Sequence, residues 1–331
     1  MNAMLAARRI VSFLPSATEM ACALGLADQL LGVIHECDYP PEIRDKPVVV
    51  RNVLPVERMT ELEIDTAVTE RLRDGLSLYQ VDEDQMRTIA PDLILTQDLC
   101  QVCAPSGNEV AHLLRALPSQ PQVLWLTPKS IEQIFENLRE LGKATDRSRR
   151  AEEVIAAGRA RLECVADTTR KIAERPRVFC MEWLDPVYCS GHWVPQMVEI
   201  AGGRDELGPK RADSVRISWD RVLAWAPEVL IVMPCGFGLE QAAAHARQLF
   251  AYPGWCDLPA VKTNRVFAVD ASSYFARPGP RVVDGTELLA HLFHPALFQW
   301  NGPQGAFAKV EPDRETHSAR ETHARPRSCV S

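Results

Sequence analysis

The 331-residue sequence has no long hydrophobic run and no excess of basic residues. No apolar stretch approaches the ~20 residues that a membrane-spanning helix needs, so we expect no membrane span. The formal net charge of −7 argues against general nucleic-acid binding, because such binding needs a basic face. A hydrophobic content of 46% and a charged content of 24% are typical of a globular protein, and the length is enough for two domains.

The common catalytic sequence motifs are missing as well. There is no Gly-x-Gly-x-x-Gly or Gly-x-x-x-x-Gly-Lys loop for phosphate groups, and no Gly-x-Ser-x-Gly elbow for a nucleophilic serine. Glu182 and Asp185 are close in sequence, but without a third partner they do not define an acid–base pair. The sequence therefore predicts a protein that is not an enzyme.

A secretory signal is the third absence. Residues 1–9 are short and mixed in character, and Pro15, Thr18 and Glu19 follow the apolar residues 10–14 at once. As written, the sequence predicts a cytoplasmic protein, and a periplasmic one if the true start lies upstream. The ten cysteines are scattered, and a cytosolic protein would keep them reduced.

Short apolar segments alternate with amphipathic ones along most of the chain. Ser16 is expected to cap a helix over 17–24, with Glu19 completing a capping box. Alternation of this kind predicts α/β architecture with mainly parallel sheets. The predicted strands are 9–14, 30–34, 48–50, 93–95, 123–126, 177–183, 229–233 and 265–270.

One long helix and one internal repeat divide the chain. Residues 146–174 contain a single glycine and have apolar residues at helical spacing, which predicts a helix of roughly 40 Å between two lobes. Asp84–Thr96 matches Asp220–Val232 in its Asp, Ala and Pro positions, and an acid and an apolar strand follow each proline. The predicted domains are an N-terminal lobe at 1–145, a linker helix at 146–175, a C-terminal lobe at 176–298 and a disordered tail at 299–331.

Cysteine and histidine side chains follow several predicted strands. Ligands of parallel sheets bind beyond the carboxyl ends of the strands, and thiolate and imidazole groups suit zinc, iron or cobalt. The alternatives are buried packing for the thiols and hydrogen bonds to loop carbonyls for the imidazoles. The candidate metal ligands are His35, Cys37, Cys100, Cys103, Cys189 and His192, with Cys235 in a further loop.

The sequence resembles the helix-linked class of the periplasmic-binding-protein family, of the vitamin B12 and iron-siderophore type. Residues 9–19, the two Pro-acid-strand joints and the long helix carry this resemblance. It is most similar to the subgroup named cobalamin-binding protein, through His35-Glu-Cys-Asp-Tyr-Pro, Thr96-Gln-Asp-Leu-Cys-Gln-Val-Cys-Ala, the Gly191–Gly203 stretch and Pro278-Gly-Pro-Arg. The resemblance covers roughly residues 9–295.

This resemblance implies two Rossmann-like lobes joined by one long helix, with a ligand cleft between the lobes. It implies that the chain binds cobalamin, a related metal–tetrapyrrole or an iron chelate, as the substrate-binding component of an ABC-type importer or as a homologue derived from one. In the family an acidic residue on each lobe docks onto the permease, and the matching positions are Asp84 and Asp220. We expect a monomer.

The expected ligand-binding residues are of two kinds. Aromatic rings offer apolar area to a flat macrocycle, although each ring could equally be a core residue. Arg277 and Arg281 flank Pro278–Pro280 and could hold a carboxylate or phosphate as forked donors, or form surface ion pairs instead. The complete set of predicted ligand-binding residues is Pro15, Ser16, His35, Glu36, Tyr39, Tyr79, Gln97, Asp98, Trp183, Asp185, His192, Trp193, Phe237, Tyr274 and Arg277.

Two alternatives remain open from the sequence. The first is a cytosolic metal-binding or redox protein of the same fold, which would hold zinc or iron with His35, Cys37, Cys100 and Cys103. The second and weaker one is an enzyme acting on a tetrapyrrole, for which the sequence offers no catalytic group.

Overall fold

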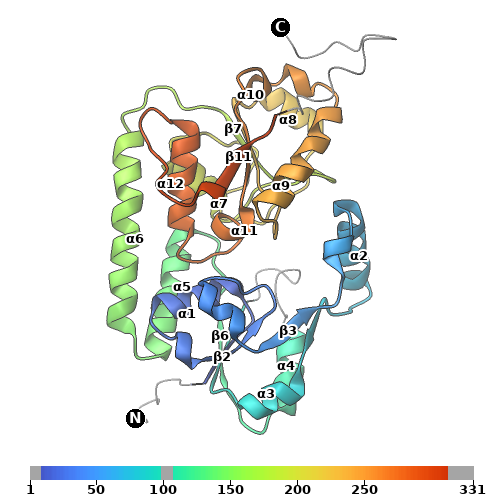
Figure 1. Cartoon of the computed structure of the whole chain (residues 1–331), viewed down its shortest axis with the longest axis vertical. Helices are drawn as coiled ribbons and strands as arrows, with labels where there is room; N and C mark the ends of the chain where they lie inside the picture. The colour runs from blue at the N-terminus through green and yellow to red at the C-terminus, as the bar shows by residue number, and fades with distance from the viewer. Residues whose placement is uncertain (1–8, 98–106, 312–331) are drawn as a thin grey trace. The chain divides into compact units, whose positions relative to one another are not determined.

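The structure is a computed structural model, and it describes residues 9–97 and 107–311 (Figure 1). The chain forms two compact units. The N-terminal unit comprises Met1–Cys164 together with Arg277–Asp284, and the C-terminal unit comprises Val165–Ala276 together with Gly285–Ser331. The segment Arg277–Asp284, which we call the return segment, lies in a range that the sequence assigns to the C-terminal lobe.

The N-terminal unit is built on a six-stranded sheet in the order β4-β3-β2-β1-β5-β6. Five strands are parallel, and only the edge strand β4 runs antiparallel, against β3. The central strands are almost entirely buried, as expected for strands covered on both faces. The strands are β1 (Ile10–Ser12), β2 (Leu30–Ile34), β3 (Val48–Asn52), β4 (Tyr79–Val81), β5 (Leu93–Thr96) and β6 (Gln122–Trp125).

Within residues 9–97 and 107–144 of this unit there are five helices and three short 3-10 turns. Helix α1 contacts α5 and helix α3 contacts α4, and these two pairs lie on different sides of the sheet in Figure 1. The helices are α1 (Pro15–Ala23), α2 (Glu61–Arg73), α3 (Glu83–Ile89), α4 (Gly107–Ala116) and α5 (Ile131–Ala144), and the 3-10 turns are Ala27–Gln29, Pro41–Asp45 and Val56–Arg58.

The C-terminal unit has a five-stranded sheet in the order β11-β10-β9-β7-β8. Its three central strands are parallel, and an antiparallel strand closes each edge. The strands are β7 (Val178–Trp183), β8 (Tyr188–Cys189), β9 (Val229–Val232), β10 (Val266–Val269) and β11 (Phe307–Lys309). The helices are α7 (Val194–Ile200), α8 (Trp219–Trp225), α9 (Leu239–Ala246), α10 (Pro259–Lys262) and α11 (Ala271–Tyr274), with 3-10 turns at Arg247–Ala251, Trp255–Asp257 and Gln304–Ala306.

The chain passes from one unit to the other at three points, and two of them lie inside helices. Helix α6 (Ser148–Thr169) has 22 residues, so it is about 33 Å long and shorter than the sequence indicated. The unit boundary falls inside it, between Cys164 and Val165, and a second boundary falls inside α12 (Val282–Phe293). The expectation of one long helix between the lobes is therefore confirmed, and the return segment adds two further crossings, one between Ala276 and Arg277 and one inside α12.

The internal repeat forms the same local structure in both units. Helix α3 ends at Ala90 with a φ of 44°, and helix α8 ends at Ala226 with a φ of 49°. Both alanines adopt the left-handed conformation that closes many helices. A proline and an acidic residue follow each of them and lead directly into a buried strand, β5 or β9.

An arginine completes each copy of this joint, and the sequence repeat did not include it. The Nε of Arg9 donates to the Ala90 carbonyl at 3.1 Å, and the Nε of Arg177 donates to the Ala226 carbonyl at 3.0 Å. In return, the acid after each proline accepts the backbone N–H of that arginine, at 3.1 Å for Asp92 and 2.9 Å for Glu228. The two units are thus related by local structure as well as by sequence.

Three sequence-based expectations about the elements are wrong. Ser16 does not cap α1, because Pro15 already occupies the first turn and the cap position is Leu14. The Glu19 side chain instead contacts Arg281. Residues 184–192, where no strand was predicted, contain β8, and the tail expected to be disordered from residue 299 contains β11, which pairs with β10.

Candidate functional site

The predicted ligand-binding residues of the N-terminal unit lie at one edge of its sheet. Strand β1 lies between β2 and β5, and parallel strands end at the same edge. Pro15 and Ser16 follow β1, His35 and Glu36 follow β2, and Gln97 follows β5. Ser16 and Gln97 are both 4% exposed. The structure therefore brings together residues from three separate segments of the sequence.

A charged network surrounds the loop 36–40, which follows β2. The Nε and Nη2 atoms of Arg281 donate to the two carboxylate oxygens of Glu19, at 2.9 and 2.6 Å. Arg277 reaches Asp38 at 2.5 Å and the Glu36 carbonyl at 2.9 Å. The return segment is in this way attached to the N-terminal unit by two forked cations.

Glu19 is the most deeply placed charge of this network. Its side chain is 2% exposed, while the arginine side chains are each 12% exposed. Burial raises the pKa of the Glu19 carboxyl, and the hydrogen bond and charge of Arg281 act against that rise. A paired, buried carboxylate of this kind costs little while its partner stays, and much once the partner is removed.

His35 and Cys37 have different surroundings in the same region. The Nδ1 atom of His35 is buried and has no hydrogen-bond partner among the described residues. The Sγ atom of Cys37 lies 3.1 Å from the Thr18 hydroxyl. Burial raises the pKa of the Cys37 thiol to about 12, so the thiol is neutral at pH 7. A metal bound at Cys37 would have to displace this proton, because metals bind the thiolate.

In the C-terminal unit the ends of the parallel strands are aromatic. Trp183 ends β7, and its ring lies edge-to-face with that of Phe237, with centroids 5.6 Å apart. His245 also packs against Phe237, with ring centroids 4.8 Å apart. Backbone hydrogen bonds from Cys235 to Glu182 and from Ser272 to Phe237 join the loop after β9 to the end of β7 and to α11. Trp183 and Phe237 are half-buried, so part of each ring is accessible.

His192 has a constrained backbone. Its φ of 54° is in the left-handed region, which costs a residue with a side chain about 1 kcal/mol or more. Two backbone hydrogen bonds, to Ala212 and from Arg211, hold it there, and its Nε2 lies 3.2 Å from an Asp213 carboxylate oxygen. A Cβ on the preceding Gly191 would lie 2.5 Å from the Ser214 nitrogen, so only glycine fits that position.

Other predicted residues are less available to a ligand than expected. Trp193, Tyr274 and Tyr79 are 4%, 7% and 6% exposed, so their rings are core residues. The Trp193 Nε1 donates to the Phe275 carbonyl at 2.9 Å, which accounts for its one polar group. Asp185 is exposed in the loop between β7 and β8. Asp98, Cys100 and Cys103 lie outside the described residues.

The metal-site expectation finds no support within residues 9–97 and 107–311. No group of three or more His, Cys, Asp or Glu side chains there is arranged to hold a metal ion. Cys189 is fully buried and donates to the Val215 carbonyl at 3.3 Å, and burial raises the pKa of its thiol. Both Cys37 and Cys189 are thus buried thiols with a hydrogen-bonding neighbour in this arrangement.

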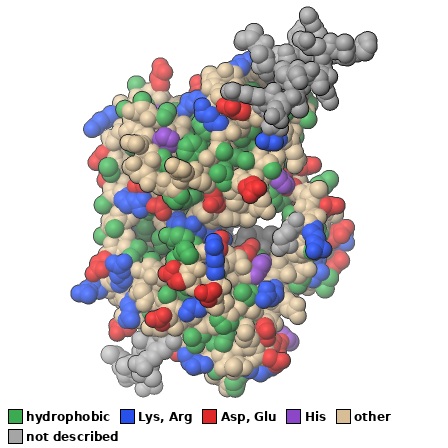
Figure 2. Space-filling model, viewed as in Figure 1, with side chains coloured by type: hydrophobic (Ala, Val, Ile, Leu, Met, Phe, Trp, Pro, Cys, Tyr) green, Lys and Arg blue, Asp and Glu red, His purple; other side chains and the backbone are tan. Residues whose placement is uncertain are grey.

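The predicted docking acids occupy equivalent positions in the two units. Asp84 lies in the first turn of α3, where its carboxylate is 95% exposed and pairs with Arg87 at 2.6 Å. Asp220 lies in the first turn of α8 and is also exposed. Figure 2 shows acidic and basic side chains interspersed over the visible surface.

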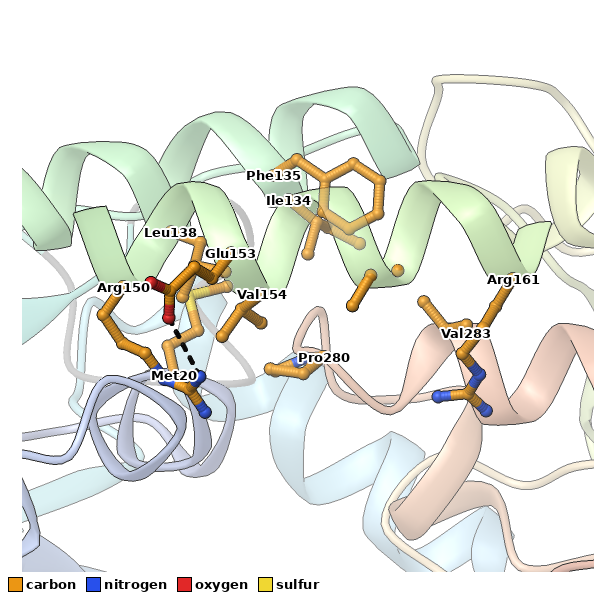
Figure 3. Close-up of a pocket in the computed structure, with 12 residues that line it drawn as sticks. Met20, Ile134, Phe135, Leu138, Arg150, Glu153, Val154, Arg161, Pro280 and Val283 are labelled. Carbon is orange, nitrogen blue, oxygen red and sulfur yellow. Dashed lines mark hydrogen bonds and ion pairs between the residues drawn. The ribbon is translucent and has the colours of Figure 1, made fainter. Parts of the chain in front are cut away.

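A separate cavity of about 210 Å³ lies within the N-terminal unit (Figure 3). Mainly apolar side chains of α1, α5, α6 and the return segment line it, and Arg150 and Arg161 lie toward its ends. Binding pockets for drug-sized ligands usually measure about 300–1,000 Å³. This cavity is therefore too small for a metal chelate, and no predicted ligand-binding residue lines it.

Only weak signals in the sequence point to the network around Glu19. Glu19 is an acidic residue in an otherwise apolar or small stretch, Ala17–Ala23 apart from Thr18, which is unusual for a fully buried helix. Asp38 stands out in the sequence only as part of the motif that begins at His35. The pairing of these acids with Arg277 and Arg281, some 240–260 positions away, required the tertiary structure.

Two α/β units with an inter-unit helix and parallel strand ends that carry polar and aromatic groups define a two-lobed solute-binding protein. The family model described as periplasmic binding protein matches residues 10–272. The chain belongs to this family, and the resemblance inferred from the sequence is confirmed. No helix in the described part of the chain combines the length and apolar character needed to cross a bilayer.

Curated relatives match over most of their length. The chain is 25% identical to the vitamin B12-binding protein of Vibrio cholerae over 284 residues, which are 85% of this chain and 87% of that protein. It is 22% identical to an uncharacterized ABC transporter substrate-binding lipoprotein of Bacillus subtilis over 300 residues, covering 88% of this chain and 82% of the relative. Both names describe binding proteins.

Solved structures support the same fold. The periplasmic vitamin B12 binding protein of Vibrio cholerae has a TM-score of 0.64 at 23% identity, covering 88% of this chain and 99% of that one. A periplasmic heme binding protein of Pseudomonas aeruginosa has a TM-score of 0.70 at 19% identity, covering 92% and 99%. The predicted fold class is therefore confirmed.

Proposed function

We propose that this protein binds cobalamin or a related metal–tetrapyrrole or iron chelate without changing it, as the substrate-binding component of an ABC-type importer. The observation that carries the proposal is the similarity to a vitamin B12-binding protein along 85% of the chain. Similarity that extends along most of both chains supports the same class of ligand. The choice of ligand within that class rests on the chemistry of the site.

The chemistry of both sheet edges supports a large, partly apolar ligand. Trp183 and Phe237 offer aromatic area in the C-terminal unit. His35, Glu36, Tyr39 and Arg277 offer a smaller number of polar anchors in the N-terminal unit. Ligand sites commonly combine a mostly apolar lining with a few polar groups that fix orientation.

The proposal also has a partner and a location. Asp84 and Asp220 would contact basic residues of a permease, and the protein would act as a monomer outside the cytoplasmic membrane, where such importers collect their substrate. The relatives named periplasmic or lipoprotein support this location. Cell fractionation tests it, and recovery of all the protein in the cytosol would refute it.

Titration with hydroxocobalamin tests the ligand. We expect the corrinoid absorption bands to shift on addition of protein, and heat to be released at micromolar protein concentration. Trp183→Ala should weaken binding by roughly 10-fold, about 1.4 kcal/mol, because the ring loses its contact area. Leu297→Ala, which removes a 59% exposed apolar residue beyond the end of α12, is the control and should bind like wild type.

Heme and ferric chelates are the next ligands to titrate if cobalamin gives no signal. Absence of binding for all three classes would overturn the proposal. Metal analysis of freshly purified protein addresses the cysteine-based alternative, because stoichiometric zinc or iron that is lost in Cys37→Ser would favour a resident metal site instead.

A further inference from the structure

Arg277 has a partner that can leave it. The Arg277 side chain is 12% exposed, and its Nη1 atom lies 2.5 Å from Asp38 Oδ1. Its Nη2 atom donates to the Glu36 carbonyl at 2.9 Å. The Asp38 side chain is 49% exposed, so it can turn into solvent without losing a buried position. Such a rotation would uncover the guanidinium group of Arg277.

Glu19 does not take the place of Asp38. Arg281 holds both carboxylate oxygens of Glu19 in a forked pair at 2.9 and 2.6 Å. Arg277 touches Glu19 through one contact of 3.5 Å, at the limit of a hydrogen bond. The charge of Glu19 is therefore balanced by Arg281, while the charge of Arg277 is balanced mainly by Asp38.

An anion from a ligand could replace Asp38 as the partner of Arg277, and the charge of Arg277 would stay balanced. Ion pairs with a solvent-exposed partner are weak, and they are lost easily. An incoming carboxylate or phosphate can accept from the Nη1 atom of Arg277 as Asp38 does, while Nη2 keeps its bond to the Glu36 carbonyl. Whatever else the incoming molecule contacts then decides whether the exchange takes place.

Tyr39 supplies such a further contact. It follows Asp38 directly, its side chain is 44% exposed, and the Arg281 guanidinium lies 4.2 Å from its ring centroid. The cation holds one face of the ring by a cation–π interaction. An exposed aromatic ring beside an anion position suits a flat macrocycle with a charged group on its periphery.

From these contacts we infer that Arg277 binds an anionic group of the ligand, a carboxylate or a phosphate, in place of Asp38, and that Tyr39 lies against the adjoining ring system. This inference rests on the proposed function for the macrocycle, but the anion position can be tested without one. It assigns Asp38 the role of an internal competitor that lowers affinity for anionic ligands and gives no advantage to neutral ones.

The first experiment uses inorganic phosphate and thermal unfolding, with chloride at matched ionic strength as the reference. Asp38→Asn should bind phosphate at least about 10-fold more tightly than wild type, and Asp38→Asn/Arg277→Gln should lose that gain. Asp45→Asn makes the same charge change on the following 3-10 turn and should behave as wild type. Equal phosphate binding by all four proteins would overturn the inference.

The second experiment compares iron protoporphyrin IX with its dimethyl ester, which has the same ring and metal but no carboxylates. Wild type should prefer the acid, and Asp38→Asn should strengthen that preference roughly 3- to 10-fold while leaving the ester affinity unchanged. Arg277→Gln should remove the preference. An absorption titration in the Soret band gives all affinities.

The two experiments separate the possible failures. Equal affinity for acid and ester, with no phosphate effect, would overturn the anion site while leaving chelate binding intact. A phosphate effect that depends on Arg277, without binding of either porphyrin, would support the anion site and count against porphyrins as ligands. A preference for the acid that survives Arg277→Gln would place the anion elsewhere and also overturn the inference.

Discussion

The two units share one structural joint and differ in the loops at their strand ends. In each unit a helix ends in a left-handed alanine, a proline and an acid come next, and an arginine binds the end of the helix. Yet the N-terminal strand ends carry a charged network, while those of the C-terminal unit carry an aromatic cluster. Local backbone structure thus repeats between the units, whereas the chemistry of their loops does not.

The two units also differ in the hydrogen-bond partners of a buried carboxylate. Glu19 of the N-terminal unit has a forked arginine partner. Asp205 of the C-terminal unit has no such partner: its Oδ1 accepts the backbone N–H groups of Leu207 and Gly208, and its Oδ2 is buried without a hydrogen bond among the described residues. A cation opposes the effect of burial on the pKa of Glu19, and only two backbone N–H groups oppose it for Asp205.

The largest expected effect comes from breaking the Glu19 pair. Glu19→Gln leaves the Arg281 cation buried without its counter-charge, which should lower the free energy of unfolding of the N-terminal unit by about 3–5 kcal/mol. Urea denaturation followed by circular dichroism measures this change. Glu19→Gln/Arg281→Met should recover part of the loss, because it removes both charges together.

Glu152→Gln is the matched control for this substitution. Glu152 also accepts from an arginine, Arg139 at 2.5 Å, but its side chain is 54% exposed. An exposed pair contributes about 0–1 kcal/mol, so this variant should stay near wild type. Similar losses from both substitutions would contradict the distinct role given to the buried pair.

The second effect is the contribution of Asp205 to the pH dependence of stability. Burial raises the pKa of Asp205 to about 6, with the N–H groups of Gly208 and Leu207 opposing the rise. Because the folded state binds this proton more tightly than the unfolded chain, the contribution to stability is complete below about pH 4. It is lost as the pH rises through 6, with a span of at most about 3 kcal/mol.

Asp205→Asn tests this prediction. The amide oxygen of asparagine can still accept the two backbone N–H groups, but the side chain no longer titrates. Unfolding measured between pH 4 and 8 should show a smaller decline for the variant than for wild type, and the difference between the curves should be centred between pH 4 and 6. Parallel curves would show that Asp205 does not titrate in this range.

The smallest effect concerns the shared joint. Ala90→Gly and Ala226→Gly each remove the strain of a left-handed alanine, which is partly offset by the greater freedom of glycine in the unfolded chain. Each should stabilise its unit by about 0–1 kcal/mol, and by similar amounts. Ala156→Gly, on an exposed position of α6, should instead destabilise by about 1 kcal/mol. If one of the two alanine substitutions stabilised its unit and the other destabilised its unit, the two joints would not be equivalent.

The aromatic predictions show where sequence reasoning was insufficient. All five of the following aromatic residues were predicted to bind the ligand. Trp183 and Phe237 are partly accessible, whereas Trp193, Tyr274 and Tyr79 are core residues. An aromatic residue at a strand end meets a ligand or packs inward according to its neighbours in space. For Tyr274, one of those neighbours is Trp300, which comes from a separate segment of the chain.

By itself the sequence determined the βα alternation, the long helix, the two related halves and the family of this protein. These depend on periodicity, helix boundaries and short motifs, which act over a few neighbouring residues. Only the tertiary structure decided that the return segment belongs with the N-terminal unit, that Glu19 pairs with Arg281 and that Arg277 is held by Asp38. Ion pairs and burial depend on groups hundreds of positions apart, and no local pattern encodes which of them meet.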